Sequence, residues 1–180
     1  MEKILFKEEQ RFTQWWLWLL LIFAFAVGVI PIWYGLFQQI QTGKPWGDNP
    51  TTDAGLWIIA VFTTFLMTGI LLTFKTTRLL TEIRHDGIYF RFPPFIRKWR
   101  IVSKDEIEKF TVGKYNPIKE YGGYGVRTSF GKYGRAYNTC GNLGLRVYLK
   151  SGKVLLFGTQ RTQALSAAMQ KMMSEKEQIR

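Results

Sequence analysis

The sequence contains few of the residues that build metal and cofactor sites. Among its 180 residues there is one cysteine, Cys140, and one histidine, His85. A single thiol excludes an intrachain disulfide and a cysteine-cluster metal site, and a single imidazole excludes a pair of histidine ligands. His85 precedes Asp86-Gly87, a two-residue hairpin signal, so we expect a solvated turn histidine. We therefore expect no metal and no other cofactor.

Groupings of residues that carry out catalysis are also scarce. Hydrolysis or group transfer needs a nucleophile with a base, a pair of carboxylates or a metal cluster. The acidic residues after position 74 are scattered along the chain: Glu82, Asp86, Asp105, Glu106, Glu108, Glu120, Glu175 and Glu177. The sequence predicts no catalytic residues, and we expect that the protein is not an enzyme.

Charge is missing from two long stretches. The apolar segments 15–37 and 54–74 contain no Asp, Glu, Lys or Arg. About 20 apolar helical residues suffice to cross a hydrocarbon core, and tryptophans mark the start of both segments, as is common at a membrane interface. A secretory signal cleaved after Ala26 fits less well, because the apolar run continues to Phe37. We predict that residues 1–76 comprise an N-terminal segment and two transmembrane helices.

The basic residues around these segments indicate an orientation. The connection between the two segments has a single lysine, Lys44. The flanking segments have six basic residues: Lys3, Lys7, Arg11, Lys75, Arg78 and Arg84. Cytoplasmic loops carry an excess of Lys and Arg. The sequence therefore predicts a multi-pass protein with both termini in the cytoplasm.

The remaining charge is strongly asymmetric. The chain has a net charge of +12, yet residues 1–74 contain only four basic and five acidic residues. Such asymmetry points to an anionic partner, either nucleic acid or a lipid surface. The alternative is that the charge only maintains solubility. The tether to a membrane argues against nucleic acid.

The pattern of apolar residues changes at about residue 77. Short segments rich in β-branched and aromatic residues, separated by turn signals, predict about seven strands. The clearest pair is "LGLRVYLK" and "KVLLFGT", joined by Ser151-Gly152 and ending at Gly158. A helical stripe then follows: Leu165, Ala168, Met169 and Met172. Residues 77–180 are predicted to form a bent antiparallel sheet capped by a C-terminal helix.

The stretches "EYGGYGVR", "AYNTCGNLGLRVYLKSGK" and "FGTQRTQAL" resemble those of small bacterial inner-membrane proteins with two transmembrane helices and a cytoplasmic domain like a pleckstrin-homology (PH) domain. This resemblance covers most of the C-terminal part. It implies an α+β membrane protein, with a two-helix transmembrane hairpin followed by a PH-like β domain. It implies no catalytic residues.

The glycine-rich stretch "EYGGYGVR" has two interpretations. It lacks the spacing of a phosphate-binding P-loop, and Thr128 occupies the third glycine position of a dinucleotide fingerprint. The structural interpretation is a bulge or sharp bend, with Tyr121, Tyr124, Val126 and Phe130 in strand positions. The functional interpretation is a partner-binding loop, in which Arg127 would grip a carboxylate or phosphate and the tyrosines would supply flat contact area. Its candidate residues are Tyr121, Gly122, Gly123, Tyr124, Gly125 and Arg127.

A second candidate surface lies in "FPPFIRKWR". Pro93 and Pro94 cannot extend a central strand, so they mark a hairpin end or loop. The candidate membrane-surface residues are Arg97, Lys98, Trp99 and Arg100. Under the alternative interpretation, Phe95, Ile96 and Trp99 belong to the core and the charges are simply solvated.

Together these patterns favour a membrane-anchored binding or scaffold module. We expect a basic PH-like domain at the cytoplasmic face that engages anionic lipid headgroups or a protein partner. An accessory subunit of a larger membrane complex is the alternative. Self-association stays open, since Gly69 and nearby threonines could allow close helix contact.

Overall fold

The computed structural model describes residues 4–48, 50–129 and 131–174, which fall into two compact units. The helical unit comprises residues 13–75, and the β unit comprises residues up to 12 together with those from 76 onward. The sequence had assigned the whole segment 1–76 to the N-terminal segment and helices. The structure differs because residues 6–11 form a strand of the β unit.

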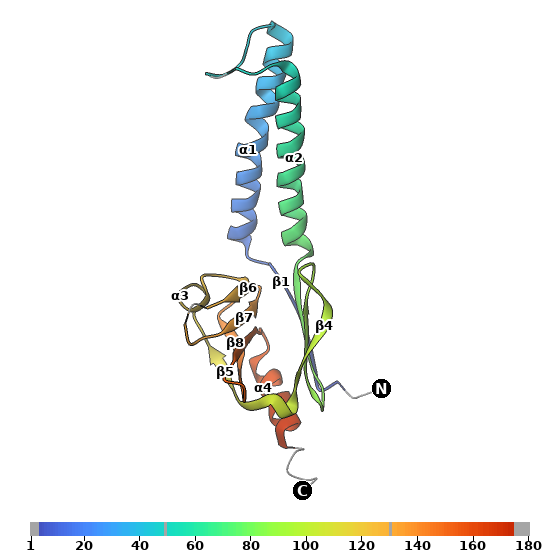
Figure 1. The fold of residues 1–180 in the computed structure, drawn as a ribbon, viewed down its shortest axis with the longest axis vertical. Coiled ribbons are helices and arrows are strands. Elements are labelled where there is room, and N and C mark those ends of the chain that lie inside the picture. Colours follow the sequence, from blue (N-terminus) through green and yellow to red (C-terminus); the bar gives the residue numbers. More distant parts are fainter. Residues whose placement is uncertain (1–3, 49, 130, 175–180) are drawn as a thin grey trace. The chain divides into compact units, whose positions relative to one another are not determined.

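The helical unit is an antiparallel pair, α1 (Trp15–Thr42) and α2 (Asp53–Thr76) (Figure 1). Both helices are long and apolar enough to cross a membrane. They extend beyond the predicted 15–37 and 54–74, and α1 continues through Pro31. Helix α1 stops at Gly43, whose φ of 65° suits glycine and whose N–H donates to the Gln39 carbonyl.

Contacts between the two helices are few and specific. The Trp33 indole donates to the Thr64 hydroxyl at 2.9 Å and meets the Trp57 ring edge-on at 5.5 Å. A small cluster of Leu36, Leu56 and Ala60 is buried between them. Many of the other large apolar side chains of the two helices are exposed, which is the arrangement expected for helices surrounded by lipid.

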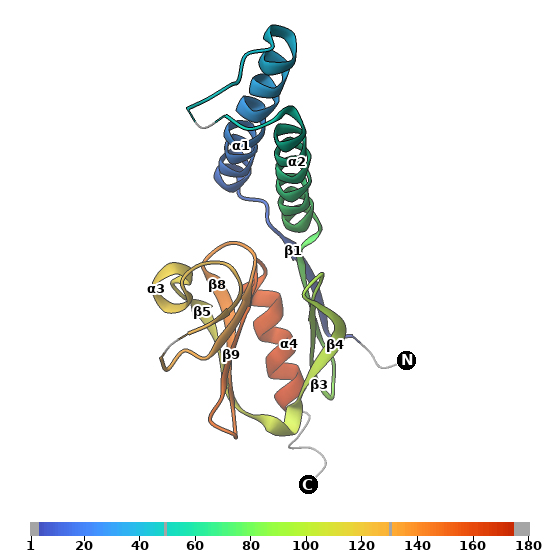
Figure 2. The ribbon, with the colours of Figure 1, turned by 45° about the horizontal axis from the view of Figure 1, so that its top comes forward.

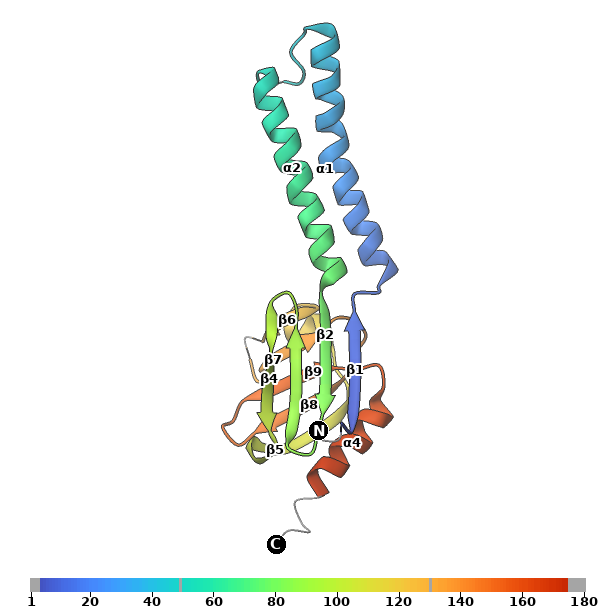
Figure 3. The same cartoon turned by 90° about the vertical axis from the view of Figure 1, so that its right-hand side faces the viewer.

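The first sheet of the β unit, sheet A, is antiparallel with the order β1-β2-β3-β4 (Figure 3). Its strands are β1 (Phe6–Arg11), β2 (Arg78–Ile83), β3 (Gly87–Phe92) and β4 (Ile96–Ser103). Strand β1 precedes the helical unit in the chain and β2 follows it. The pairing of β1 with β2, from Phe6 opposite Ile83 to Arg11 opposite Arg78, therefore brings together segments that the helices separate.

The second sheet, sheet B, is mixed and has the order β5-β8-β9-β7-β6. Its strands are β5 (Ile107–Lys114), β6 (Gly125–Thr128), β7 (Arg135–Asn138), β8 (Leu143–Leu149) and β9 (Val154–Gly158). The predicted β8–β9 hairpin is confirmed, and β9 ends at Gly158. An entirely antiparallel sheet was expected, but β7 runs parallel to β9. The chain reverses direction from β7 to β8 and again from β8 to β9, and β7 pairs with β9 and not with β8.

Helix α4 (Thr162–Ser174) lies between the two sheets (Figure 2). It buries the predicted stripe: Leu165, Ala168, Met169 and Met172. The aromatic rings of Phe90, Tyr137 and Phe157 join the two sheets, with centroids 4.6 to 5.5 Å apart. Burial of this face of α4 against both sheets supplies the main apolar core of the unit.

A partly buried polar network fastens β1 to sheet B. The Thr159 hydroxyl and the Gln160 N–H donate to the Glu8 carboxylate at 2.6 and 2.8 Å. The Gln10 amide donates to the Gly158 carbonyl at 2.7 Å. Buried polar groups are costly unless they are hydrogen-bonded, so these bonds make β1 an integral strand and not an appendage.

Candidate functional site

The first candidate surface lies at the β3–β4 hairpin. Pro93 and Pro94 occupy its turn, which confirms the predicted hairpin end. The Pro93 carbonyl accepts a hydrogen bond from the Arg78 N–H at 3.2 Å. Arg78 begins β2 just after α2 ends at Thr76, and it pairs with Arg11, which precedes α1. The hairpin turn therefore lies at the end of the β unit where both helices attach, here called the helix-proximal end.

Strand β4 leaves this turn as an edge strand with little cover. Five consecutive residues, from Arg97 to Ile101, are exposed. Phe95 in the turn is 67% exposed, and Trp99 is 36% exposed. The alternative that Phe95 and Trp99 belong to the core is wrong, because both side chains are exposed, as are Arg97, Lys98 and Arg100.

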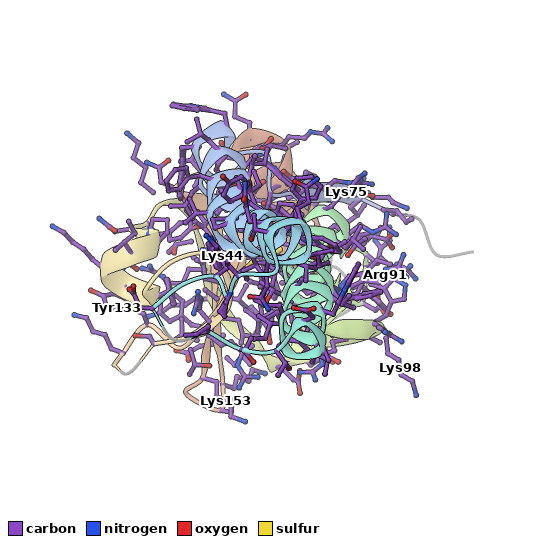
Figure 4. The ribbon with its side chains drawn as sticks, turned by 90° about the horizontal axis from the view of Figure 1, so that it is seen from above. Lys44, Lys75, Arg91, Lys98, Tyr133 and Lys153 are labelled. Carbon is purple, nitrogen blue, oxygen red and sulfur yellow. The ribbon has the colours of Figure 1, made fainter. Side chains whose placement is uncertain are left out.

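A neighbouring arginine on β3 joins this surface. The guanidinium carbon of Arg91 lies 4.7 Å from the centroid of the Trp99 ring, in a cation–π contact. Figure 4 shows Arg91 and Lys98 on the same side of the β unit. Arg91 was not predicted from the sequence, since its contact with Trp99 depends on the register of β3 and β4. We define the hairpin surface as Phe95, Arg97, Lys98, Trp99 and Arg100, with Arg91 beside it.

The carboxylates on the same face of sheet A are already paired. Glu9 accepts from Arg11 at 2.7 Å and from Arg78 at 3.3 Å, and the bond from Arg11 holds its pKa below the usual range. Burial tends to raise the pKa of Glu82, but the bonds from Arg84 and Lys7 outweigh it and leave that pKa lowered. Both carboxylates stay ionised at neutral pH, and their negative charge is balanced by the basic side chains that bind them. They therefore do not offset the positive charge of the hairpin surface.

The second candidate, the glycine stretch, forms a helix end and a turn. Pro117–Tyr121 make a short helix, α3, which begins because the Asn116 side chain accepts from the Lys119 N–H at 2.9 Å and Pro117 suits the first turn. Gly122 ends it with a φ of 71°, and Gly123 follows at 126°. Tyr121 and Tyr124 were expected in strand positions, but only Val126 lies in a strand, β6. Phe130 lies outside the described residues.

Tyr121 does not share a surface with the other predicted residues of this stretch. Tyr121 is buried, and its hydroxyl donates to the Tyr133 carbonyl at 3.0 Å, beside α3 (Figure 4). Tyr124 is half-buried, whereas Arg127 is exposed and donates to the Tyr124 carbonyl at 2.9 Å. The ring of Tyr121 therefore packs inside the domain, whereas the positive charge of Arg127 lies at the surface.

A buried side-chain network holds the start of β6. The Asn138 side chain accepts from the Gly125 N–H and donates to the Tyr115 hydroxyl, both at 2.9 Å. Burial raises the pKa of Tyr115 well above its usual range, so its hydroxyl stays protonated. We interpret this network as a clamp that fixes the turn, because each group in it is occupied by its neighbour.

Neither candidate surface contains a cluster of metal-ligating side chains. In the part of the chain that the structure describes, no group of three or more His, Cys, Asp or Glu side chains could hold a metal ion. Cys140 is buried. Comparison with family models, curated proteins and solved structures found no match to this chain. We therefore infer function from the positions of charged and exposed apolar side chains.

The glycines of the turn yield a first prediction. Gly123→Val should lower the free energy of unfolding by about 1–3 kcal/mol, because its φ of 126° is foreign to a β-branched residue. Gly113→Ala is the matched control, since Gly113 has an ordinary φ and open space around it. Denaturant unfolding of the purified protein measures both. Equal stability of Gly123→Val and the parent chain would show that the turn does not require glycine.

Proposed function

We propose that the protein is a membrane-anchored binding module. Helices α1 and α2 cross the inner membrane of a bacterium, and the β unit is a PH-like domain held at the cytoplasmic face. The length of the helices and their bare apolar sides support the anchor. The proposed role is binding and not catalysis, since Glu9, Glu82 and Glu120 are each paired with an arginine.

The pairing of β1 with β2 supports the two-crossing topology. The chain leaves sheet A at Arg11 and returns to the neighbouring strand at Arg78. A chain that leaves and re-enters one folded domain crosses the bilayer an even number of times. Lys44 is the single basic residue of the connection, whereas Arg11 and Lys75 flank the helices, so the positive-inside rule favours a cytoplasmic β unit.

The arrangement of the β unit supports the PH-like assignment. Two bent sheets enclose one C-terminal helix, α4, whose apolar stripe closes the space between them. The parallel pairing of β7 with β9 departs from a purely antiparallel PH-like sheet. This departure concerns the pairing of two inner strands of sheet B and leaves the packing of α4 between the two sheets unchanged.

The single observation that carries the proposed function is the position of the hairpin surface. Its turn is hydrogen-bonded to Arg78, beside the end of α2, and its exposed residues combine basic and apolar side chains. A basic residue near an anionic leaflet gains about 1 kcal/mol, an effect that decays within a Debye length of about 8 Å. We propose that Arg97, Lys98 and Arg100 bind lipid phosphates while Phe95 and Trp99 enter the interface. The remaining surface of the β unit would then face a protein partner.

The topology is tested by thiol labelling in intact cells. Lys44→Cys should react with an impermeant maleimide, whereas Ser151→Cys should react only after permeabilisation, since both side chains are exposed. The parent chain serves as a blank, because its one thiol, Cys140, is 5% exposed. Reaction of Ser151→Cys in unbroken cells would contradict the cytoplasmic placement.

The lipid contact is tested with the full chain in bilayer discs. A spin label at Phe95→Cys should be more accessible to oxygen, which concentrates in the bilayer, than to a water-soluble nickel complex. Arg97→Glu with Lys98→Glu should return the label to water in anionic discs, because it removes the attraction to the headgroups.

The matched control is Lys150→Glu with Lys153→Glu, which changes the net charge equally. These lysines flank the β8–β9 turn, where the Lys150 N–H donates to the Glu106 carbonyl, beyond the far end of β4. The control pair should leave the label in the bilayer. Equal effects of the two charge reversals, or a label in water in the parent chain, would refute the lipid contact.

A further inference from the structure

Apart from Ile4, the exposed large apolar side chains among the described residues of the β unit lie in two places. Among its described residues, the hairpin and β4 expose Phe95, Trp99 and Ile101. A second group lies on α3 and β6, where Ile118 is 72% exposed and Val126 is 37% exposed. Ile118 is more exposed than Phe95, although it lies next to buried Pro117. Exposed apolar side chains that are rimmed by polar ones can mark a contact with a protein or a membrane.

Contacts within the β unit place this second group at the helix-proximal end. Gln10, next to Arg11, donates to the Gly158 carbonyl at 2.7 Å. A Cβ at Gly158 would lie 3.1 Å from the Cβ of Asn138, and Asn138 accepts from the Gly125 N–H at 2.9 Å. This chain of contacts leads from the base of α1 to the glycine stretch. The hairpin turn with Phe95 and the glycine stretch therefore both lie at the end of the domain where the helices attach, whereas Ile101 lies toward the other end of β4, opposite Tyr89.

The charge of the second group matches that of the hairpin surface. Lys119 and Arg127 are exposed beside Ile118 and Val126. The nearby carboxylate of Glu120 is paired with Arg146 at 2.5 Å, so it does not neutralise them. The surface is basic and apolar. The three glycines of the glycine stretch add no side chains that would cover it.

We infer that Ile118, Lys119, Tyr124, Val126 and Arg127, here called the α3–β6 surface, form a second contact with the anionic leaflet. This inference rests on the proposed function. The hairpin surface belongs to sheet A and the α3–β6 surface to sheet B, so two contacts fix the tilt of the domain where one would leave it free to rock. The small glycine turn lets the backbone approach the headgroups closely.

The test again uses the full chain in discs that contain anionic lipid. A spin label at Ile118→Cys should be more accessible to oxygen than to the nickel complex, whereas a label at Ser151→Cys should show the reverse. Lys119→Glu with Arg127→Glu should return the label at 118 to water and leave a label at position 95 in the bilayer. The Lys150→Glu and Lys153→Glu pair should change neither.

The outcomes separate this inference from the proposed function. A label at 118 in water, with the label at 95 in the bilayer, overturns the second contact and leaves the hairpin contact standing. Labels at both positions in water overturn both. A label at 118 that is immobilised and shielded from oxygen and nickel alike indicates a protein partner, which also overturns the inference.

Discussion

The structure depends on the pairing of β1 with β2. Six residues before the first helix form a regular antiparallel ladder with six residues after the second, from Phe6 opposite Ile83 to Arg11 opposite Arg78. Cα atoms of such partners lie only about 5 Å apart. The helical unit is thus an insertion between adjacent strands of one sheet. Both of its ends are joined to the helix-proximal end of the β unit.

This insertion explains why the membrane contacts are proposed where they are. Glu8 and Gln10 join β1 to Thr159 and Gly158, so the base of α1 is linked to sheet B as well as to sheet A. The β3–β4 turn and the glycine turn, one in each sheet, then share the helix-proximal end. In the proposed arrangement, a domain anchored by two neighbouring strands stays near the bilayer, and its basic side chains stay within reach of the headgroups.

Patterns that depend on neighbouring residues were predictable from the sequence. The long apolar runs indicated α1 and α2, the stripe through Met169 indicated α4, and Ser151-Gly152 indicated the β8–β9 hairpin. Strand β1 was missed because "FKEEQR" has Phe6 as its one apolar residue and its partner strand is about 70 positions away. Its inward side chains are mostly polar, and only the hydrogen bonds of Glu8 and Gln10 explain their burial.

The candidate sites were also only partly predictable from the sequence, because they depend on residues that are far apart in the chain. Exposure of Trp99 and the contact with Arg91 follow from the register of β3 and β4, which the sequence does not specify. Helix α3 did leave a local signal, since Asn116-Pro117 is typical of a helix start and Gly122 of its end. That signal predicts a helical Tyr121, whereas the burial of its ring depends on packing against Tyr115 and Tyr133.

The central claim is that the helical unit is inserted into a single β domain, and a spliced chain tests it most directly. Joining Phe12 to Thr76 through a short glycine-serine linker should yield a soluble protein that unfolds cooperatively, as measured by circular dichroism and amide NMR. The fragment 77–180 should not, because it lacks β1 and the burial of Phe6, a loss of about 3–5 kcal/mol for one large side chain alone. Cooperative folding of the fragment with the stability of the spliced chain would contradict the account.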